Sequence, residues 1–171
     1  AQELLQDPYL IKDRKTNMRF YVLLICQNNE INLYVHNDGF MYYTKMPFEK
    51  GSMKSGPNIT TGYIERWVYH VNSLSHMDFK EYLDNPNREL VNVEKELFKK
   101  TNKISTIVFE RIYALIKNVI IAMDKNICYE SKLKPYISFQ LFGVDIALDD
   151  QLIPKVMEFN IGPNLATHDD K

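Results

Sequence analysis

The sequence predicts an α+β domain in which an antiparallel sheet packs against one long buried helix. Two groups of strand-like apolar runs, one near each end of the chain, flank a single long stretch whose apolar residues recur three and four positions apart. The length of 171 residues suits one domain, and 45% hydrophobic with 25% charged residues is the composition of a folded protein. We therefore expect residues 1–171 to form a single domain.

The first half of the chain predicts three antiparallel strands. Residues 18–26 (MRFYVLLIC) and 31–36 (INLYVH) are rich in branched and aromatic side chains, which favour strands. Asp38 and Gly39 follow, and an Asp-Gly pair is a strong signal for a tight hairpin because both residues tolerate positive φ. Residues 40–44 (FMYYT) then form the third strand.

The middle of the chain predicts a surface loop and two helices. Glycine, serine, lysine and proline dominate residues 47–57, which indicates a loop. A short helix is expected to begin at Asp78, whose carboxylate can accept from the free amides of the first turn, and to end before Pro86. The long helix spans residues 105–124 and is apolar enough to be buried on more than one side. Its apolar stripe comprises Ile104, Val108, Ile112, Leu115, Val119 and Met123.

A second hairpin is predicted near the end of the chain. Residues 137–148 and 153–160 are strand-like runs separated by a short polar turn. Asp145 interrupts the first run, and Glu158 and Asn160 lie two apart in the second, so they share one face. Counting outward from the turn brings Asp145 opposite this pair, and three oxygen-bearing side chains are expected to converge.

Two carboxylates placed this close together repel each other unless a cation neutralises them. Oxygen ligands without histidine or cysteine suit Mg²⁺, which accepts a few carboxylates together with water and phosphate oxygens. Asp145, Glu158 and Asn160 are therefore predicted metal ligands, with nucleotide phosphates completing the shell. The alternative is that they are polar residues at a strand end that face solvent.

A second polar cluster, residues 12–19, precedes the first strand. Lys15, Asn17 and Arg19 alternate with other residues and so share one face of an extended chain. A lysine can hold a phosphate as a mobile point charge, and an arginine holds it with a fixed fork of donors. This row is a candidate site for the phosphates or ribose of a nucleotide. The alternative is a charged loop that keeps the strand entry soluble.

Composition excludes several function classes. The 21 Lys and Arg residues balance 22 Asp and Glu residues, so the chain lacks the basic field that nucleic-acid binding needs. Its longest apolar run, residues 20–26, is shorter than the ~20 residues of a membrane span. We expect no nucleic-acid or membrane partner, reduced cysteines at Cys26 and Cys128, and histidines at the surface or in capping positions.

The two polar clusters, in this order, resemble the tubulin tyrosine ligase-like family of ATP-grasp amino-acid ligases. Residues 13–24 (DRKTNMRFYVLL) resemble the family's G-R-K-x-D-x-R strand entry. Residues 139–165 resemble its long ending, F-E-L-F-G-x-D…P-x-x-x-E-x-N-x-x-P-x-L. Residues 1–5 look like the hinge segment that meets adenine, and residues 58–61 fall where an H-L-T-N-like motif sits. The resemblance covers nearly the whole chain.

The resemblance implies a role for each matching residue. Gln2, Leu5, Lys15, Asn17 and Asp145 would bind ATP, and Asp145, Glu158 and Asn160 would hold Mg²⁺. Arg19 and Glu158 would be catalytic.

The resemblance also implies an activity. ATP would convert a carboxylate to an acyl phosphate, and the amine of a free amino acid would then attack it. Tubulin or another acidic protein tail would be the acceptor, in the cytoplasm and associated with the cytoskeleton. The chain would be the C-terminal lobe of a longer ligase, because the family's N-terminal domain and upstream glycine loop have no counterpart in it.

Three positions depart from the family pattern. Asn17 replaces an aspartate, Tyr42 replaces an arginine and Thr61 replaces the last asparagine of the H-L-T-N-like motif. A tyrosine cannot supply the permanent charge of an arginine. These departures favour a second hypothesis, a pseudo-ligase that keeps the fold and docks on microtubules without transferring an amino acid. A ligase for a carboxylate outside tubulin is a third.

Overall fold

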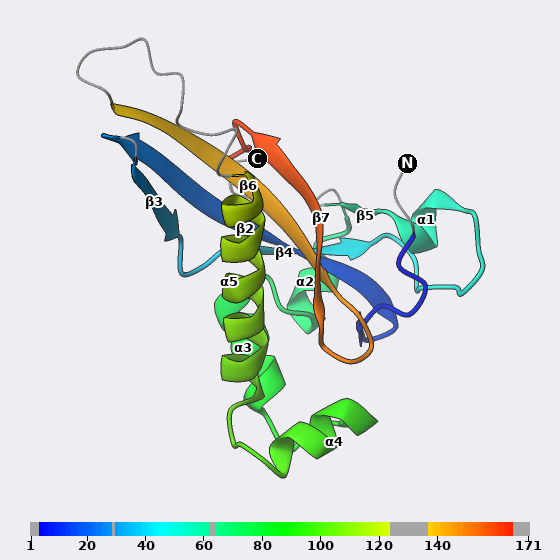
Figure 1. The fold of residues 1–171 in the computed structure, drawn as a ribbon. Helices are drawn as coiled ribbons and strands as arrows, with labels where there is room; N and C mark the ends of the chain where they lie inside the picture. Colours follow the sequence, from blue (N-terminus) through cyan, green and yellow to red (C-terminus); the bar gives the residue numbers. More distant parts are fainter. Residues whose placement is uncertain (1–3, 29, 62–63, 124–136, 166–171) are drawn as a thin grey trace.

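A computed structural model describes residues 4–28, 30–61, 64–123 and 137–165 of the chain (Figure 1). The described part is α+β, as the sequence predicts, with a curled antiparallel sheet and α5 packed across it, whereas α4 extends away from the sheet. The strands are β1 (Leu10–Ile11), β2 (Arg14–Gln27), β3 (Glu30–Val35), β4 (Phe40–Thr44), β5 (Thr60–Thr61), β6 (Ile137–Leu148) and β7 (Pro154–Ile161). The helices are α1 (Ser55–Asn58), α2 (Trp67–Val71), α3 (His76–Asp84), α4 (Asn92–Phe98) and α5 (Ile104–Met123).

Strand β2 is the centre of the sheet. The strand order is β5-β4-β2-β6-β7, and β1 and β3 also pair with β2. Strands β6 and β7 form the predicted hairpin. The Asp149 carboxylate closes its turn by accepting hydrogen bonds from the N–H groups of Gln151 at 3.0 Å and Ile153 at 2.8 Å. This turn chemistry explains why the polar residues between the two runs were a sound hairpin signal.

The predicted hairpin between β3 and β4 is wrong. Both strands pair with β2, where Val35 lies opposite Val22 and Phe40 lies opposite Arg19. The two strands therefore follow one another along one edge of β2. Gly39 sits where the chain passes from β3 to β4, and a Cβ there would lie 2.1 Å from the carbonyl oxygen of Arg19. The glycine serves a close approach of two backbones rather than a chain reversal.

The hydrophobic core lies between α5 and one face of the sheet. Alternate residues of β2 point into it, and the Phe20 ring lies 6.1 Å from that of Phe109 on α5. The buried residues of α5 form one stripe, whereas Ile121 and Met123 stay exposed. The helix thus covers one face of the sheet (Figure 1). No helix among the described residues has the length and apolarity to cross a membrane. The opposite face of β2 carries the polar row described below.

Helix α3 begins two residues earlier than predicted. Its N-cap is Ser75, whose hydroxyl accepts from the N–H of Asp78 at 3.2 Å. The Asp78 carboxylate accepts in turn from the N–H groups of Leu74 and Ser75, at 3.0 and 2.9 Å. Asp78 is therefore the third residue of a capping box. It caps the helix as expected, but from inside its first turn.

Two expectations about single residues are wrong. His76 is fully buried rather than at the surface, and its ring lies 4.2 Å from that of Phe20. Cys26 is disulfide-bonded rather than reduced. The burial of His76 cannot be read from local pattern, because it depends on what the sheet and helices bring against this side chain; Cys128 lies outside the described residues.

Candidate functional site

Three polar side chains form one row across the sheet, on the face opposite α5. Arg19 on β2 lies opposite Asp145 on β6, and Asp145 lies opposite Glu158 on β7. The pairing of Asp145 with Glu158 is the one that the residue count predicts. The register shifts after Asp145, because Ile146 pairs with Val156. This β-bulge compensates for a turn that is one residue off the expected count.

Arg19 and Asp145 form a two-pronged ion pair. The Arg19 Nε donates to Asp145 Oδ1 at 2.5 Å, and its Nη2 donates to Oδ2 at 2.9 Å. Asp145 is 8% exposed, and burial raises its pKa above the ordinary value despite the opposing effect of Arg19. The hydrogen bond that Arg19 donates to Asp145 is the main cause of a raised pKa of Arg19. Because Asp145 is buried, its negative charge requires a cation beside it, and Arg19 supplies that positive charge in this structure.

The other two predicted metal ligands lie beside this pair. Asn160 Nδ2 donates to Glu158 Oε1 at 2.7 Å, and Glu158 is exposed. Asp145, Glu158 and Asn160 therefore offer oxygen donors from neighbouring positions of β6 and β7. Among the described residues no group of three or more His, Cys, Asp or Glu side chains could hold a metal by itself. Two carboxylates and one amide fit Mg²⁺, which takes its remaining ligands from water or phosphate.

Small and aromatic residues hold the Arg19 guanidinium against Asp145. Gly143 lies next to it on β6, where an added Cβ would sit 3.1 Å from Arg19 Nη1 and 2.8 Å from the Cβ of Pro163. The Arg19 Cζ lies 5.4 Å from the centre of the Tyr42 ring. Tyr42 thus makes a cation–π contact with Arg19.

Lys15 and Asn17 continue the row along β2. Lys15 is 3% exposed, and its ammonium group makes no hydrogen bond or ion pair with the described residues; burial lowers its pKa. Asn17 has a buried Oδ1 for which the described residues supply no hydrogen-bond donor. A buried cation and an unsatisfied acceptor on one face are both costly. Together they suit an anionic, hydroxyl-bearing ligand such as a nucleotide.

Of the two predicted adenine-binding residues, Leu5 is not brought to this row. Gln2 lies outside the described residues. Leu5 lines a pocket of about 580 Å³ beside the β6–β7 turn, together with Asp149, Asp150 and Lys155. The pocket beside the turn has a mixed polar and apolar lining. A second pocket, of about 600 Å³, is lined mainly by apolar side chains and adjoins the polar row on the same face of the sheet. Tyr21, Leu23, Phe40 and Leu141 supply much of the wall of that second pocket.

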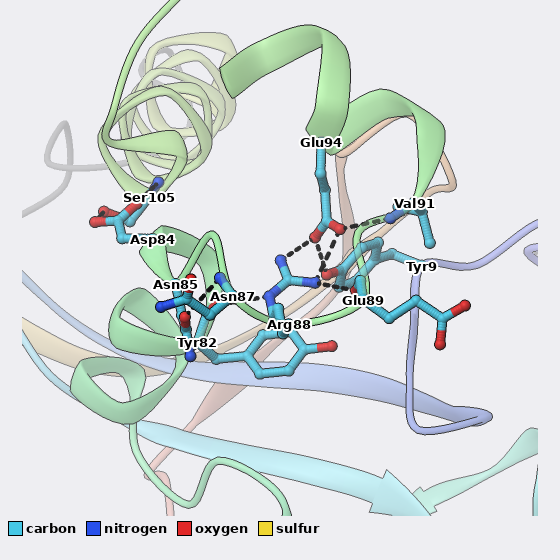
Figure 2. Close-up of polar contacts among 10 residues, drawn as sticks. All are labelled: Tyr9, Tyr82, Asp84, Asn85, Asn87, Arg88, Glu89, Val91, Glu94 and Ser105. Atoms are coloured by element: carbon cyan, nitrogen blue, oxygen red, sulfur yellow. Dashed lines mark hydrogen bonds and ion pairs between the residues drawn. The ribbon is translucent and has the colours of Figure 1, made fainter. Parts of the chain in front are cut away.

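Sequence reasoning missed a buried polar cluster around Glu94, which is 0% exposed (Figure 2). Its carboxylate accepts from Tyr9 Oη at 2.5 Å, from both terminal nitrogens of Arg88 and from the N–H of Val91 at 2.9 Å. Arg88 Nε also donates to the carbonyl oxygen of Tyr82 at 2.7 Å. Glu94 in the first turn of α4 is a recognisable capping signal, but its remote partners are not. The cluster joins α3 and α4 to the residue before β1, which is a structural role.

A comparison with known protein families identifies the family of this chain. The model of the tubulin-tyrosine ligase family matches residues 1–171. The chain belongs to the tubulin-tyrosine ligase family. Membership confirms the resemblance seen in the motifs at residues 13–24 and 139–165.

Curated relatives cover nearly all of this chain. Tubulin monoglutamylase TTLL4 of Mus musculus is 28% identical over 175 residues, which are 96% of this chain and 14% of that protein. Tubulin polyglutamylase TTLL5 of Mus musculus is 27% identical over 95% of this chain and 12% of its own length. Tubulin polyglutamylase TTLL7 of Xenopus tropicalis is 25% identical over 98% of this chain and 19% of its own length. The chain therefore spans less than a fifth of these relatives.

Proposed function

We propose that this chain is the C-terminal ATP-grasp lobe of an ATP-dependent ligase that attaches an amino acid, glutamate first among the candidates, to tubulin. The observation that carries the proposal is the row of Arg19, Asp145 and Glu158 on the open face of the sheet. The relatives named as tubulin glutamylases support the substrate and the reaction class. We further propose that the protein works in association with microtubules.

The nucleotide would bind along the polar face of β2. Lys15, a largely buried residue, offers its ammonium group to the phosphates, and Asn17 offers an unsatisfied oxygen to a hydroxyl donor such as a ribose. Leu5 and Gln2 are proposed adenine contacts. Mg²⁺, held by Asp145, Glu158 and Asn160, would supply charge neutralisation for the phosphates. These assignments use the polar side chains of β2 that the described part of the fold leaves without sufficient partners.

The proposed reaction has two transfers. A carboxylate oxygen of the acceptor attacks the terminal phosphorus of ATP, the bond to the bridging oxygen breaks, and ADP leaves. The amine of the incoming amino acid then attacks the acyl carbon, loses a proton and expels phosphate. Arg19 would stabilise the negative charge on the transferring group, and Glu158 would keep the phosphates in register through its place in the ligand set. Electrostatic stabilisation of this kind is usually the largest catalytic contribution.

A binding module without transfer activity is the second candidate. Tyr42 favours it, because this residue packs against Arg19 where the family has a second permanent charge. Asn17 also has one negative charge fewer than the family's aspartate. The presence of Asp145, Glu158 and Asn160 in one neighbourhood opposes it.

An incorporation assay separates the two candidates. The protein is incubated with ATP, Mg²⁺, tubulin and labelled glutamate, tyrosine or glycine, beside a Glu158→Gln variant. We expect incorporation that Glu158→Gln abolishes and that Glu96→Gln, an exposed control on α4, leaves unchanged. Tubulin that co-sediments with the protein without any incorporation would assign the chain to the binding module.

A further inference from the structure

We propose that Arg19 is an exchangeable counter-ion of Asp145, which the divalent cation displaces when it binds. The guanidinium neutralises the carboxylate before the cation arrives, and it is released toward the transferring group when the cation takes its place. This inference rests on the metal site of the proposed function and adds a positioning role for the Arg19–Asp145 pair.

The geometry of the pair creates a competition. Arg19 donates to both oxygens of Asp145, at 2.5 and 2.9 Å, and so occupies the chelating edge of the carboxylate. A cation that binds both oxygens needs the same edge. One that binds a single oxygen would lie a few ångströms from the guanidinium, within a buried pair in which like charges repel strongly. Either mode weakens the ion pair.

The surroundings allow Arg19 to leave without becoming unsupported. Its side chain is 13% exposed, and its guanidinium also contacts the Tyr42 ring, which lies on β4 rather than on the metal-binding hairpin. Glu158, the next residue of the row, is exposed, so the row is open on the side from which a cation and phosphates would enter. The Tyr42 contact can be kept while the two hydrogen bonds to Asp145 are lost.

The exchange would couple cation binding at Asp145 to the release of Arg19 for anion binding. A cation at Asp145 would free the donors of Arg19 at the moment when a phosphate is bound nearby. Without a cation, Arg19 would remain on Asp145 and would be a poor ligand for an anion. Arg19 would thus respond to cation loading rather than act as a permanently available positive charge.

Metal titrations test the competition. Mg²⁺ binding is measured by calorimetry for the unmodified chain, Arg19→Gln, Lys15→Gln and Glu158→Gln. We expect Arg19→Gln to bind at least about tenfold more tightly, because a direct competitor is removed. Lys15→Gln removes a charge from the same face without touching Asp145, and we expect a clearly smaller gain. Equal gains for the two variants would overturn the exchange and leave only a general charge effect.

A direct view of Arg19 comes from the ¹H–¹⁵N signals of the arginine Nε groups. The chain has five arginines, and Arg19→Gln identifies the Arg19 signal. Without Mg²⁺, the hydrogen bond to Asp145 should slow the exchange of the Arg19 Nε–H with solvent. We expect Mg²⁺ to abolish this protection. Arg88 Nε–H, bonded to the Tyr82 carbonyl at 2.7 Å, is the internal reference and should not change.

The outcomes distinguish this inference from the function on which it rests. Mg²⁺ binding that depends on Glu158 while Arg19 stays protected would overturn the exchange and keep the metal site. Binding by Arg19→Gln but not by the unmodified chain would support the exchange, with Arg19 as the stronger competitor. No binding by any variant would overturn the metal site and the exchange together.

Discussion

His76 makes the stability of this fold sensitive to acid, and the size of the effect follows from its burial. The ring is fully buried between Phe20 and Phe109, and neither ring nitrogen has a hydrogen-bond partner within the described part of the chain. Burial lowers the pKa of His76 from its ordinary value of 6.5 to about 3. Asp38 and the backbone of Phe40 oppose this effect, whereas Lys80 and His36 add to it.

The direction of the pH effect on the free energy of unfolding follows from proton uptake. Between pH 6.5 and 3 the unfolded chain binds a proton at His76 that the folded chain does not, so acid favours unfolding. The contribution is therefore fully present above pH 6.5 and is lost as the pH falls. At about 1.4 kcal/mol per pH unit, the loss is about 2 kcal/mol by pH 5 and about 5 kcal/mol by pH 3.

The test compares the unmodified chain with His76→Leu, which removes the titration and keeps an apolar side chain of similar size. Free energies of unfolding are measured by urea denaturation at intervals from pH 7.5 to 5. The difference between the two proteins should change by about 2 kcal/mol over this range in favour of the variant. His70→Asn is the control, because His70 is exposed in the folded state. Parallel curves for the unmodified chain and His76→Leu would refute the reasoning.

Two other substitutions probe the packing of charged groups. Glu94→Gln should destabilise the fold by about 3–5 kcal/mol, because it leaves the Arg88 guanidinium without its buried carboxylate. The control is Glu96→Gln: Glu96 forms an exposed pair with Lys99, so its substitution should leave the unfolding midpoint unchanged. Gly143→Ala should cost about 1–3 kcal/mol and strengthen Mg²⁺ binding, because the new methyl group would displace Arg19, the competitor of the cation, from its close contact beside Gly143. A Gly143→Ala protein with unchanged stability and metal affinity would show that the close contact is relieved at no cost.

Much of the sheet could be predicted because its strands carry strong local signals. Residues 40–44 and 137–148 were predicted with the bounds that the structure has, and the β6–β7 turn was found from its polar residues. The partner of β4 could not be found in the same way. Asp38-Gly39 is equally suited to a hairpin and to a close passage along a third strand, and only the length of β2, which holds both β3 and β4, decides between them. Helix α1, inside the expected loop, spans only four residues and has no periodicity to read.

The candidate site also has parts that local sequence predicts and parts that it does not. Asp145 and Glu158 are paired across a hairpin with a short turn, so counting residues from the turn predicts their pairing. The ion pair between Arg19 and Asp145 joins positions 126 residues apart, and no local pattern reports it. For that reason the sequence predicts a phosphate-binding and catalytic role for Arg19 but not its ion pair with Asp145. The resemblance to the family named both residues but did not state that they touch.

The sheet order explains why the two polar clusters need each other. Strand β2 is central, with β4 on one side and β6 on the other, so its outward polar residues face neighbours on both sides. The cationic cluster at the start of β2 consequently lies beside the carboxylates of the C-terminal hairpin. A charged strand entry or an acidic hairpin is commonplace when taken alone. Because β2 pairs with β6 in a register that joins Arg19 to Asp145, the cations and the carboxylates form one charge-balanced surface, which offers donors to a polyanion beside oxygen ligands for a divalent cation.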